Sequence, residues 1–228
     1  MRDRDARIAG ILYIVAIVAG VFDLRILPDR FAVIGDPAST ARNIVAHEFL
    51  FRVGIAADLV VGVIWLFVVL ALYQLLKDVD RIQAGLMIVL GAFMQVPLYF
   101  VTASYRAAAL SIASDVTLWS AFSQAQRDAL MTLFLRLHSY EIQASFLFAG
   151  LWLAPFGILV YKSKVFPRTI GVWLVANGAA YVAICLLDFL NPHIADIAST
   201  FASPLLFAEI AIALWLTVFG TKTFGRRR

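Results

Sequence analysis

The most regular feature of the sequence is the recurrence of long apolar stretches separated by polar connections. A helix needs about 20 mostly apolar residues to cross the hydrocarbon core of a bilayer, and six stretches reach that length. They cover approximately residues 7–27, 49–76, 82–112, 139–161, 169–190 and 203–221. The pattern predicts an all-α fold, a bundle of six transmembrane helices in an integral membrane protein.

The composition agrees with this interpretation. Apolar residues make up 62% of the chain, charged residues 15%, and the mean hydropathy is +0.88. Such a chain has too little polar surface to coat a water-soluble globule. The six stretches occupy most of the 228 residues and leave two longer connections, at 28–48 and 113–138. We therefore predict a single transmembrane domain, residues 1–228.

Basic residues predict the orientation in the bilayer. The two ends of the chain, the turn at 77–81 and the turn at 162–168 hold 12 of the 19 lysines and arginines, whereas the turn at 191–203 holds none. Basic residues accumulate on the cytoplasmic side, so both termini are predicted to be cytoplasmic. The pI near 9.4 follows from this distribution and suits anionic lipid head groups better than nucleic acid. The sequence does not predict an oligomeric state.

The longer connections are expected to lie on the outer side and to be ordered. Asp36 followed by Pro37 is typical of a helix start, with Asp36 as the N-cap and Pro37 at the first helical position. A short interfacial helix is therefore predicted over 38–47. Residues 120–137 carry apolar positions at helical spacing. This segment either lies on the outer surface or continues directly into the fourth transmembrane helix.

Ionisable residues within the apolar stretches fall mostly at the ends predicted to face outward. Charges in hydrocarbon are costly and usually face a bundle interior or a water-filled cavity, so their common depth predicts one polar site open to the outside. Carboxylates outnumber arginines six to three, and the surplus acids must take up protons, bind cations or pair with loop arginines. The set is Asp23, Arg25, Glu48, Arg52, Asp58, Arg106, His138, Glu141, Asp188 and Glu209.

Polar residues within three of the stretches recur at helical spacing. The third stretch has Gln95, Tyr99, Thr102 and Arg106 on one face of a 3.6-residue period. The fifth repeats the pattern with Asn177, Tyr181, Cys185 and Asp188, and the fourth has His138, Glu141 and Ser145. These faces are predicted to line the polar site.

Asp58 is the deepest carboxylate of the set. Gly54 and Gly62 flank it at spacings of four, and small residues at that spacing mark close helix contacts in lipid, so Asp58 is predicted to point inward. It lies about 13 Å into the hydrocarbon at 1.5 Å per residue. Glu48 and Arg52, one turn apart, are predicted to form a local ion pair at the interface.

Several chemistries have no support in the sequence. The three histidines do not show zinc-ligand spacing, so no metal site and no cofactor are predicted. The single cysteine, Cys185, excludes an intrachain disulfide and is interpreted as a core residue. No serine lies in a nucleophile elbow, and glycine-rich phosphate loops are absent. Pro97 is predicted to kink the third helix beside Gln95 and Tyr99.

Three functions remain open on these residues. The first is a binding or transport protein whose outward-facing, acid-rich cavity accepts a proton, a cation or a small amphipathic ligand. The second is a membrane enzyme acting on a lipid head group, with His138 and Glu141 as acid and base. The third is a structural or partner-binding protein with every buried charge satisfied. The predicted ligand-binding residues are Asp23, Asp58, Gln95, Tyr99, Arg106, Glu141, Asp188 and Glu209.

Five segments, spread in order over nearly the whole chain, resemble a bacterial membrane family, domain of unknown function 4386. They are GILYIVAIVAG (10–20), LFRVGIAADLV (50–60), LHSYEI (137–142), FPRTIGVWLV (166–175) and AEIAIALWL (208–216). The resemblance implies a single six-helix domain in the bacterial inner membrane. It implies no activity, because the family has no established one.

Overall fold

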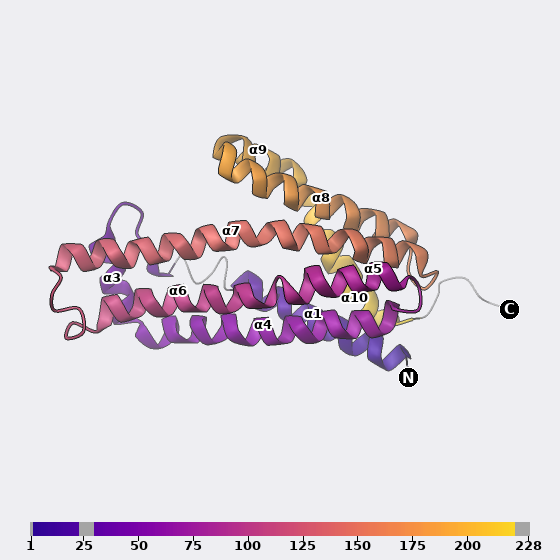
Figure 1. Ribbon diagram of the computed structural model, residues 1–228, viewed down its shortest axis with the longest axis horizontal. Coiled ribbons are helices and arrows are strands. Elements are labelled where there is room, and N and C mark those ends of the chain that lie inside the picture. The colour runs from indigo at the N-terminus through magenta and orange to yellow at the C-terminus, as the bar shows by residue number, and fades with distance from the viewer. Residues whose placement is uncertain (1, 23–29, 222–228) are drawn as a thin grey trace. The chain divides into compact units, whose positions relative to one another are not determined.

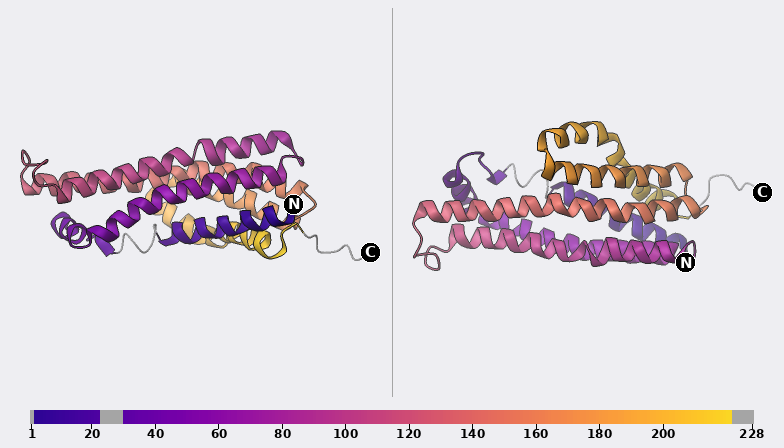
Figure 2. Two further views of the ribbon diagram at one scale, coloured as in Figure 1. Left: turned by 90° about the horizontal axis from the view of Figure 1, so that it is seen from below. Right: turned by 45° about the horizontal axis from the view of Figure 1, so that its top comes forward.

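Every element of the structure is a helix, as the sequence predicts (Figures 1 and 2). This computed structural model describes residues 2–22 and 30–221, and no strand occurs among them. The elements are α1 (Arg2–Val21), α3 (Pro37–Ala46), α4 (Glu48–Leu76), α5 (Arg81–Ile88), the π-helix η2 (Val89–Phe93), α6 (Val96–Ser114), α7 (Gln124–Lys162), α8 (Arg168–Leu190), α9 (Pro192–Ala202), the 3-10 helix η3 (Ser203–Leu206) and α10 (Phe207–Phe219).

Five helical segments of the described chain are long and apolar enough to cross a membrane. They are Glu48–Leu76, Arg81–Ser114, Gln124–Lys162, Arg168–Leu190 and Pro192–Phe219. These segments are typical of a multi-pass membrane protein. The first apolar stretch forms α1, whose opening turns carry several charged residues and which is not among the five. The count of six passes therefore stays a prediction.

Local capping explains where the shorter helices start. The Asp36 side chain accepts a hydrogen bond from the Ser39 backbone N–H at 2.9 Å, and Pro37 occupies the first turn of α3, which confirms the predicted helix start. The connection at 191–203 is a helix, α9, rather than the expected turn. Its start repeats the same chemistry, since Asn191 accepts from the Ile194 N–H at 3.3 Å and Pro192 follows it.

Residues 120–137 continue into the fourth apolar stretch, one of the two arrangements open from the sequence. Helix α7 runs unbroken from Gln124 to Lys162 and contains Pro155. At 39 residues it is far longer than the roughly 20 that a bilayer crossing needs. The connection between α6 and α7 is correspondingly short, from residue 115 to residue 123.

Packing divides the chain into two compact units. Unit 1 comprises the described parts of Met1–Ile17, Val63–Val96 and Gln143–Arg228, and unit 2 comprises those of Val18–Gly62 and Pro97–Ile142. Helices α1, α4 and α7 contribute to both. The single-domain assignment stays a prediction.

Unit 1 is organised around a cluster of buried aromatic rings. Tyr13 of α1, Trp65 of α4 and Trp152 of α7 lie within ring-centroid distances of 5.0–6.2 Å, and Phe156 stacks on Trp152 at 5.1 Å. All four side chains are buried. Aromatic pairs at such distances stabilise beyond their buried area. They join three helices of unit 1 that are distant in sequence.

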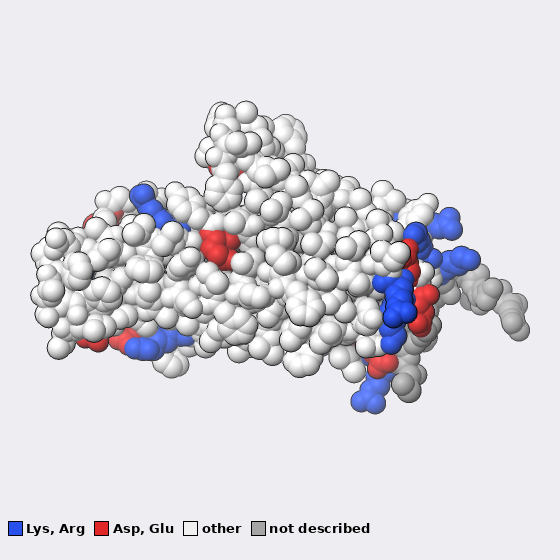
Figure 3. Space-filling model, in the orientation of Figure 1, with Lys and Arg blue, Asp and Glu red and all other residues white. Residues whose placement is uncertain are grey.

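One end of unit 1 holds its two basic turns, the start of α1 and the last described residue, Thr221. Lys162 Nζ lies 2.8 Å from Asp80 Oδ2, and the Thr221 N–H donates to Asp3 Oδ1 at 3.0 Å. Figure 3 shows Lys and Arg side chains at this end, together with Asp and Glu side chains. The described parts of the segments that the basic residues predict to be cytoplasmic thus share one end of unit 1.

The π-helix η2 ends in an interruption before Pro97. The Met94 N–H bonds to Val89 O, five residues back, rather than to Leu90 O. Gln95 Nε2 instead donates to Leu90 O at 3.1 Å and to Phe148 O of α7 at 3.3 Å. The Trp65 Nε1–H likewise donates to Gly91 O at 2.9 Å. Side chains thus bond to carbonyls near the break, where Pro97 lacks an N–H donor.

Unit 2 has its own apolar core. Phe31 and Phe51 meet edge to face at 5.1 Å, and Ile44 of α3, Leu110 of α6 and Met131 of α7 are buried with them. The short helix α3 therefore packs on α4, α6 and α7 through the buried face of its sequence. This apolar core thus joins four helices of unit 2.

Candidate functional site

The predicted ligand-binding residues are divided between the two units. Unit 2 holds Asp58, Tyr99, Arg106 and Glu141, together with His138. Unit 1 holds Gln95, Asp188 and Glu209. Asp23, like Arg25, lies outside the described residues. The clearest convergence is in unit 2, where residues of α4, α6 and α7 meet.

Asp58 of α4 and Arg106 of α6 form a buried ion pair. Arg106 Nη1 lies 3.2 Å from Asp58 Oδ2, and the two residues are 6% and 4% exposed. Charges removed from water to this extent are tolerated when they are paired. The inward orientation predicted for Asp58 is confirmed.

Gly62 explains how α4 and α6 come close enough for this pair. A Cβ atom added to Gly62 would lie 2.9 Å from Tyr99 Cβ, closer than side-chain contacts allow. Gly62 lies one turn after Asp58, and Tyr99 lies two turns before Arg106, so the helices are antiparallel here. The small residue thus permits the approach that the Gly-x3-Asp-x3-Gly spacing predicts.

Helix α7 adds His138 and Glu141 to the same unit. They lie at i and i+3 on one face. His138 is 7% exposed and close enough to Arg106 for their charges to interact. Glu141 is half-buried, and its Oε2 contacts the Thr102 hydroxyl of α6 in a short hydrogen bond. We name Asp58, Thr102, Arg106, His138 and Glu141 the unit 2 polar cluster.

Two buried atoms of this cluster lack hydrogen-bond partners. Among the described residues, neither His138 Nε2 nor Glu141 Oε1 has one. Leaving a buried polar atom unsatisfied costs about 1–3 kcal/mol. These two atoms therefore distinguish the cluster from a closed, fully satisfied network.

The Thr102 hydroxyl has consequences for the protonation of Glu141. Its oxygen lies 2.9 Å from Leu98 O, in addition to its contact with Glu141. A hydroxyl carries a single proton and can donate it to one acceptor at a time. When that proton goes to Leu98, the contact with Glu141 requires a proton on the carboxyl group. The geometry thus accommodates both the ionised and the protonated acid.

Glu209 is the centre of a separate polar group in unit 1. The Tyr13 hydroxyl donates to Glu209 Oε2, Asn177 Nδ2 lies 3.4 Å from Oε1, and Tyr181 is a further hydrogen-bond partner. Asn177 is fully buried, and its Oδ1 has no partner within the described part of the chain. The polar face of the fifth stretch indicates Asn177 and Tyr181, but the partnership of Tyr13 with Glu209 depends on tertiary packing.

The other two predicted residues of unit 1 have different surroundings. Gln95 is buried and donates to the backbone carbonyls at the end of η2. Asp188 is half-buried near the C-terminal end of α8, one turn after Cys185. Their role in ligand binding stays a prediction. Glu48 and Arg52 form the predicted local pair, with Arg52 Nη2 2.6 Å from Glu48 Oε1.

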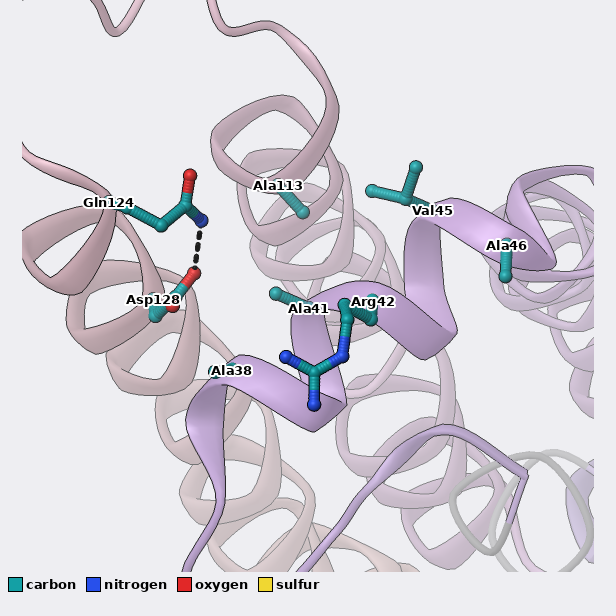
Figure 4. A pocket seen from close by; sticks show the side chains of 8 residues that line it. All are labelled: Ala38, Ala41, Arg42, Val45, Ala46, Ala113, Gln124 and Asp128. Carbon is teal, nitrogen blue, oxygen red and sulfur yellow. Dashed lines mark hydrogen bonds between the residues drawn. The ribbon is translucent and has the colours of Figure 1, made fainter.

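Two surface pockets of unit 2 are lined by residues outside the polar cluster. One, of about 500 Å³, lies between α3, the end of α6 and the start of α7. In it Gln124 Nε2 donates to Asp128 Oδ1 at 2.8 Å, and Arg42 of α3 lies on the opposite side (Figure 4). The other, of about 400 Å³, lies between α4 and α6. An outward-facing cavity at the polar cluster itself stays a prediction.

The structure describes an all-helical protein with several helices able to span a membrane and with buried ionisable clusters inside them. The chain belongs to the family Domain of unknown function (DUF4386), which matches residues 8–220 and thus nearly the whole sequence. This confirms the resemblance seen in the sequence. No curated protein and no solved structure matches the chain.

Proposed function

We propose that the unit 2 polar cluster binds a proton, a cation or a small amphipathic ligand that carries hydrogen-bond donors. The observation behind this proposal is the pair of unsatisfied buried atoms, His138 Nε2 and Glu141 Oε1, beside the Asp58–Arg106 ion pair. A carboxylate oxygen accepts hydrogen bonds, and so does the unprotonated nitrogen of a neutral imidazole. A ligand that donates to both atoms would remove the cost of leaving them unsatisfied.

The charge balance favours a positive or neutral ligand. Asp58 and Arg106 neutralise each other, so Glu141 is the remaining acid of the cluster. An anion would have to displace Asp58 from Arg106 and would leave a second buried carboxylate close by. A proton on Glu141 or a cation beside it restores neutrality.

We further propose a bacterial inner-membrane protein with both termini in the cytoplasm and the polar cluster open to the outside. The two basic turns and the start of α1, which lie at one end of unit 1, support this orientation. The outer connections then carry α3 and the start of α7, close in sequence to the helix ends that bear the cluster.

Thermal unfolding of the detergent-purified protein tests the proposal. We expect the melting temperature to change between about pH 5 and 8, or to rise with one of a panel of cations and small amines. Glu141→Gln and His138→Asn should abolish that response. His47→Asn, at an exposed position, and Glu48→Gln, at a half-buried one, replace the same residue types outside the cluster and should leave the response intact.

The outcomes separate a ligand site from a structural network. A wild-type protein whose melting temperature ignores both pH and ligands contradicts the proposal. So does a response that persists in Glu141→Gln and His138→Asn. Loss of the response in the cluster variants but not in the matched controls supports it.

A further inference from the structure

A groove between α4 and α6 in unit 2 has polar residues at one end and apolar residues along its length. Its volume is about 400 Å³. Arg52, Ser114 and Asp115 line the end where α4 begins and α6 finishes, and Ile55, Leu59 and Ala107 line the remainder. The groove is distinct from the polar cluster, because Asp58 and Arg106 do not line it.

The antiparallel contacts of the two helices explain why one end of the groove is polar and the remainder is apolar. Asp58 pairs with Arg106, and Gly62 packs on Tyr99, so the first turns of α4 lie level with the last turns of α6. From Arg52 to Leu59 the helix rises about 10 Å at 1.5 Å per residue. In a bilayer the charged end would lie at the interface, and the apolar part would lie in the outer third of the hydrocarbon.

The charged residues at the rim have unused hydrogen-bonding capacity. Arg52 contacts Glu48 through Nε and Nη2, at 2.7 and 2.6 Å, which leaves Nη1 as a donor. Asp115 Oδ1 accepts from the Leu118 N–H at 2.9 Å, and its second oxygen has no such contact with the described residues. One donor cation and one acceptor anion thus line the same end of one groove.

We propose that this groove binds a phospholipid whose zwitterionic head group ends in a primary ammonium, as in phosphatidylethanolamine. Arg52 would contact the phosphate and Asp115 the ammonium. One acyl chain would follow Ile55, Leu59 and Ala107. The Ser114 hydroxyl donates to Leu110 O at 2.9 Å, and its oxygen would be a further acceptor for the ammonium.

The charges favour this class of lipid over the alternatives. Arg52, Glu48 and Asp115 together carry a net charge of about −1, which repels an anionic lipid such as phosphatidylglycerol. A choline head group has no N–H and cannot donate a hydrogen bond to Asp115. A primary ammonium donates up to three, and hydrogen bonds between ions are the strong ones.

Native mass spectrometry of the full-length protein with equal amounts of phosphatidylethanolamine, phosphatidylcholine and phosphatidylglycerol tests the proposal. We expect phosphatidylethanolamine to be retained most. Asp115→Asn should remove its advantage over phosphatidylcholine, which we expect to be roughly tenfold for one charge-assisted hydrogen bond. Arg52→Gln should weaken both lipids, and Ala107→Phe should block the groove. Arg42→Gln, on the neighbouring helix α3, is the matched control and should change nothing.

Equal retention of the three lipids, or preferential retention of phosphatidylglycerol, overturns the proposal. So does a phosphatidylethanolamine preference that survives in Asp115→Asn and Ala107→Phe. Size-exclusion profiles identify any variant that fails to fold. The lipid preference of the remaining variants then tests the proposal. Glu141→Gln should leave lipid retention unchanged, which keeps this test separate from that of the polar cluster.

Discussion

Individual buried charges of this protein are stabilised by particular partner residues. Asp58 has Arg106 on the neighbouring helix, and Glu209 has hydroxyl and amide donors from Tyr13, Asn177 and Tyr181. Removing one member of a buried ion pair leaves an uncompensated charge in a medium that solvates it poorly. The partner residue therefore determines how far each substitution lowers the free energy of unfolding.

Single and double substitutions of the Asp58–Arg106 pair test this dependence. We expect Asp58→Asn or Arg106→Gln alone to lower the free energy of unfolding by about 3–5 kcal/mol, because each strands the opposite charge. The double variant should lose less than the sum of the two. Chemical unfolding in mixed micelles measures the three values. Additive losses would show that the two side chains do not interact.

At the scale of elements, α7 and α8 pack through matched glycines in unit 1. A Cβ atom on Gly150 would lie 2.6 Å from Gly178 O, and one on Gly157 would lie 2.6 Å from Gly171 O. The glycines are seven residues apart on each helix, so the two contacts lie on one seam. Such close approach gains van der Waals contact where lipid provides no hydrophobic driving force.

Gly157→Ala should therefore destabilise the protein. The added methyl group forces the two backbones apart, which costs about 1–3 kcal/mol for an overpacked interface. Gly85→Ala is the matched control, because no atom lies within 4 Å of its added Cβ, and a helical alanine should be neutral or stabilising by about 0.5–1 kcal/mol. Thermal unfolding of Gly157→Ala and Gly85→Ala compares their melting temperatures with that of the wild type. Equal melting temperatures for the two variants would contradict a close contact between α7 and α8 at Gly157.

The start of α5 and the end of α7 are joined by a pH-sensitive contact. Asp80 caps α5 by accepting from the Ile82 and Gln83 N–H groups, and it pairs with Lys162. The Lys162 hydrogen bond and the backbone N–H groups hold the pKa of Asp80 below its ordinary value. A lowered pKa in the folded state stabilises that state above the ordinary pKa, and the contribution disappears as the pH falls through the lowered value.

Asp80→Asn should reduce stability at pH 7 while keeping the cap, since asparagine also accepts from backbone N–H groups. The difference from wild type should begin to shrink as the pH falls below about 4, the ordinary pKa of an aspartate in the unfolded chain, and should disappear below the lowered pKa of the folded state. Thermal unfolding from neutral to acidic pH measures the difference. If the stability difference between Asp80→Asn and the wild type stays constant down to pH values well below 4, the ionised carboxylate of Asp80 is excluded as its cause.

At the scale of the whole molecule, the distribution of basic residues predicts the orientation in the membrane. Cys185 is buried and is the only cysteine of the sequence, so Cys185→Ser provides a background for site-directed labelling. Thr117→Cys lies in the connection before α7, and Ser163→Cys lies in the basic turn after it. A membrane-impermeant maleimide should label position 117 on intact cells and position 163 after permeabilisation. The reverse pattern would show that the termini face outward.

Some features of the site could be predicted from local spacing. The glycines around Asp58 indicate its inward face, the four-residue interval between Glu48 and Arg52 indicates their pair, and Asp36-Pro37 indicates the start of α3. Each is a contact within one turn of helix or a consequence of helical period. The same Asx-Pro signature at Asn191 marks the start of α9, in a connection expected from the sequence to be a turn.

Other features depend on which helix faces which, and a single sequence does not encode this in a local pattern. Thr102 meets Glu141 across two helices, and Tyr13 meets Glu209 from nearly opposite ends of the chain. Gln95 has the spacing of a site residue, yet in the structure its amide bonds to backbone carbonyls beside a proline break. Packing determines these partners because hydrogen bonds require contact distances that sequence separation does not define.

The sequence by itself thus determined the class of protein and most of its long apolar helices, because the length and apolarity of a segment decide whether it can enter hydrocarbon. It also located the ionisable residues along each helix. Only the tertiary structure decided which of them are paired, which atoms remain unsatisfied, and that the predicted residues belong to two separately packed units. The physical reason is that side-chain pairing depends on the rotation and approach of neighbouring helices, which small residues such as Gly62 permit at particular points.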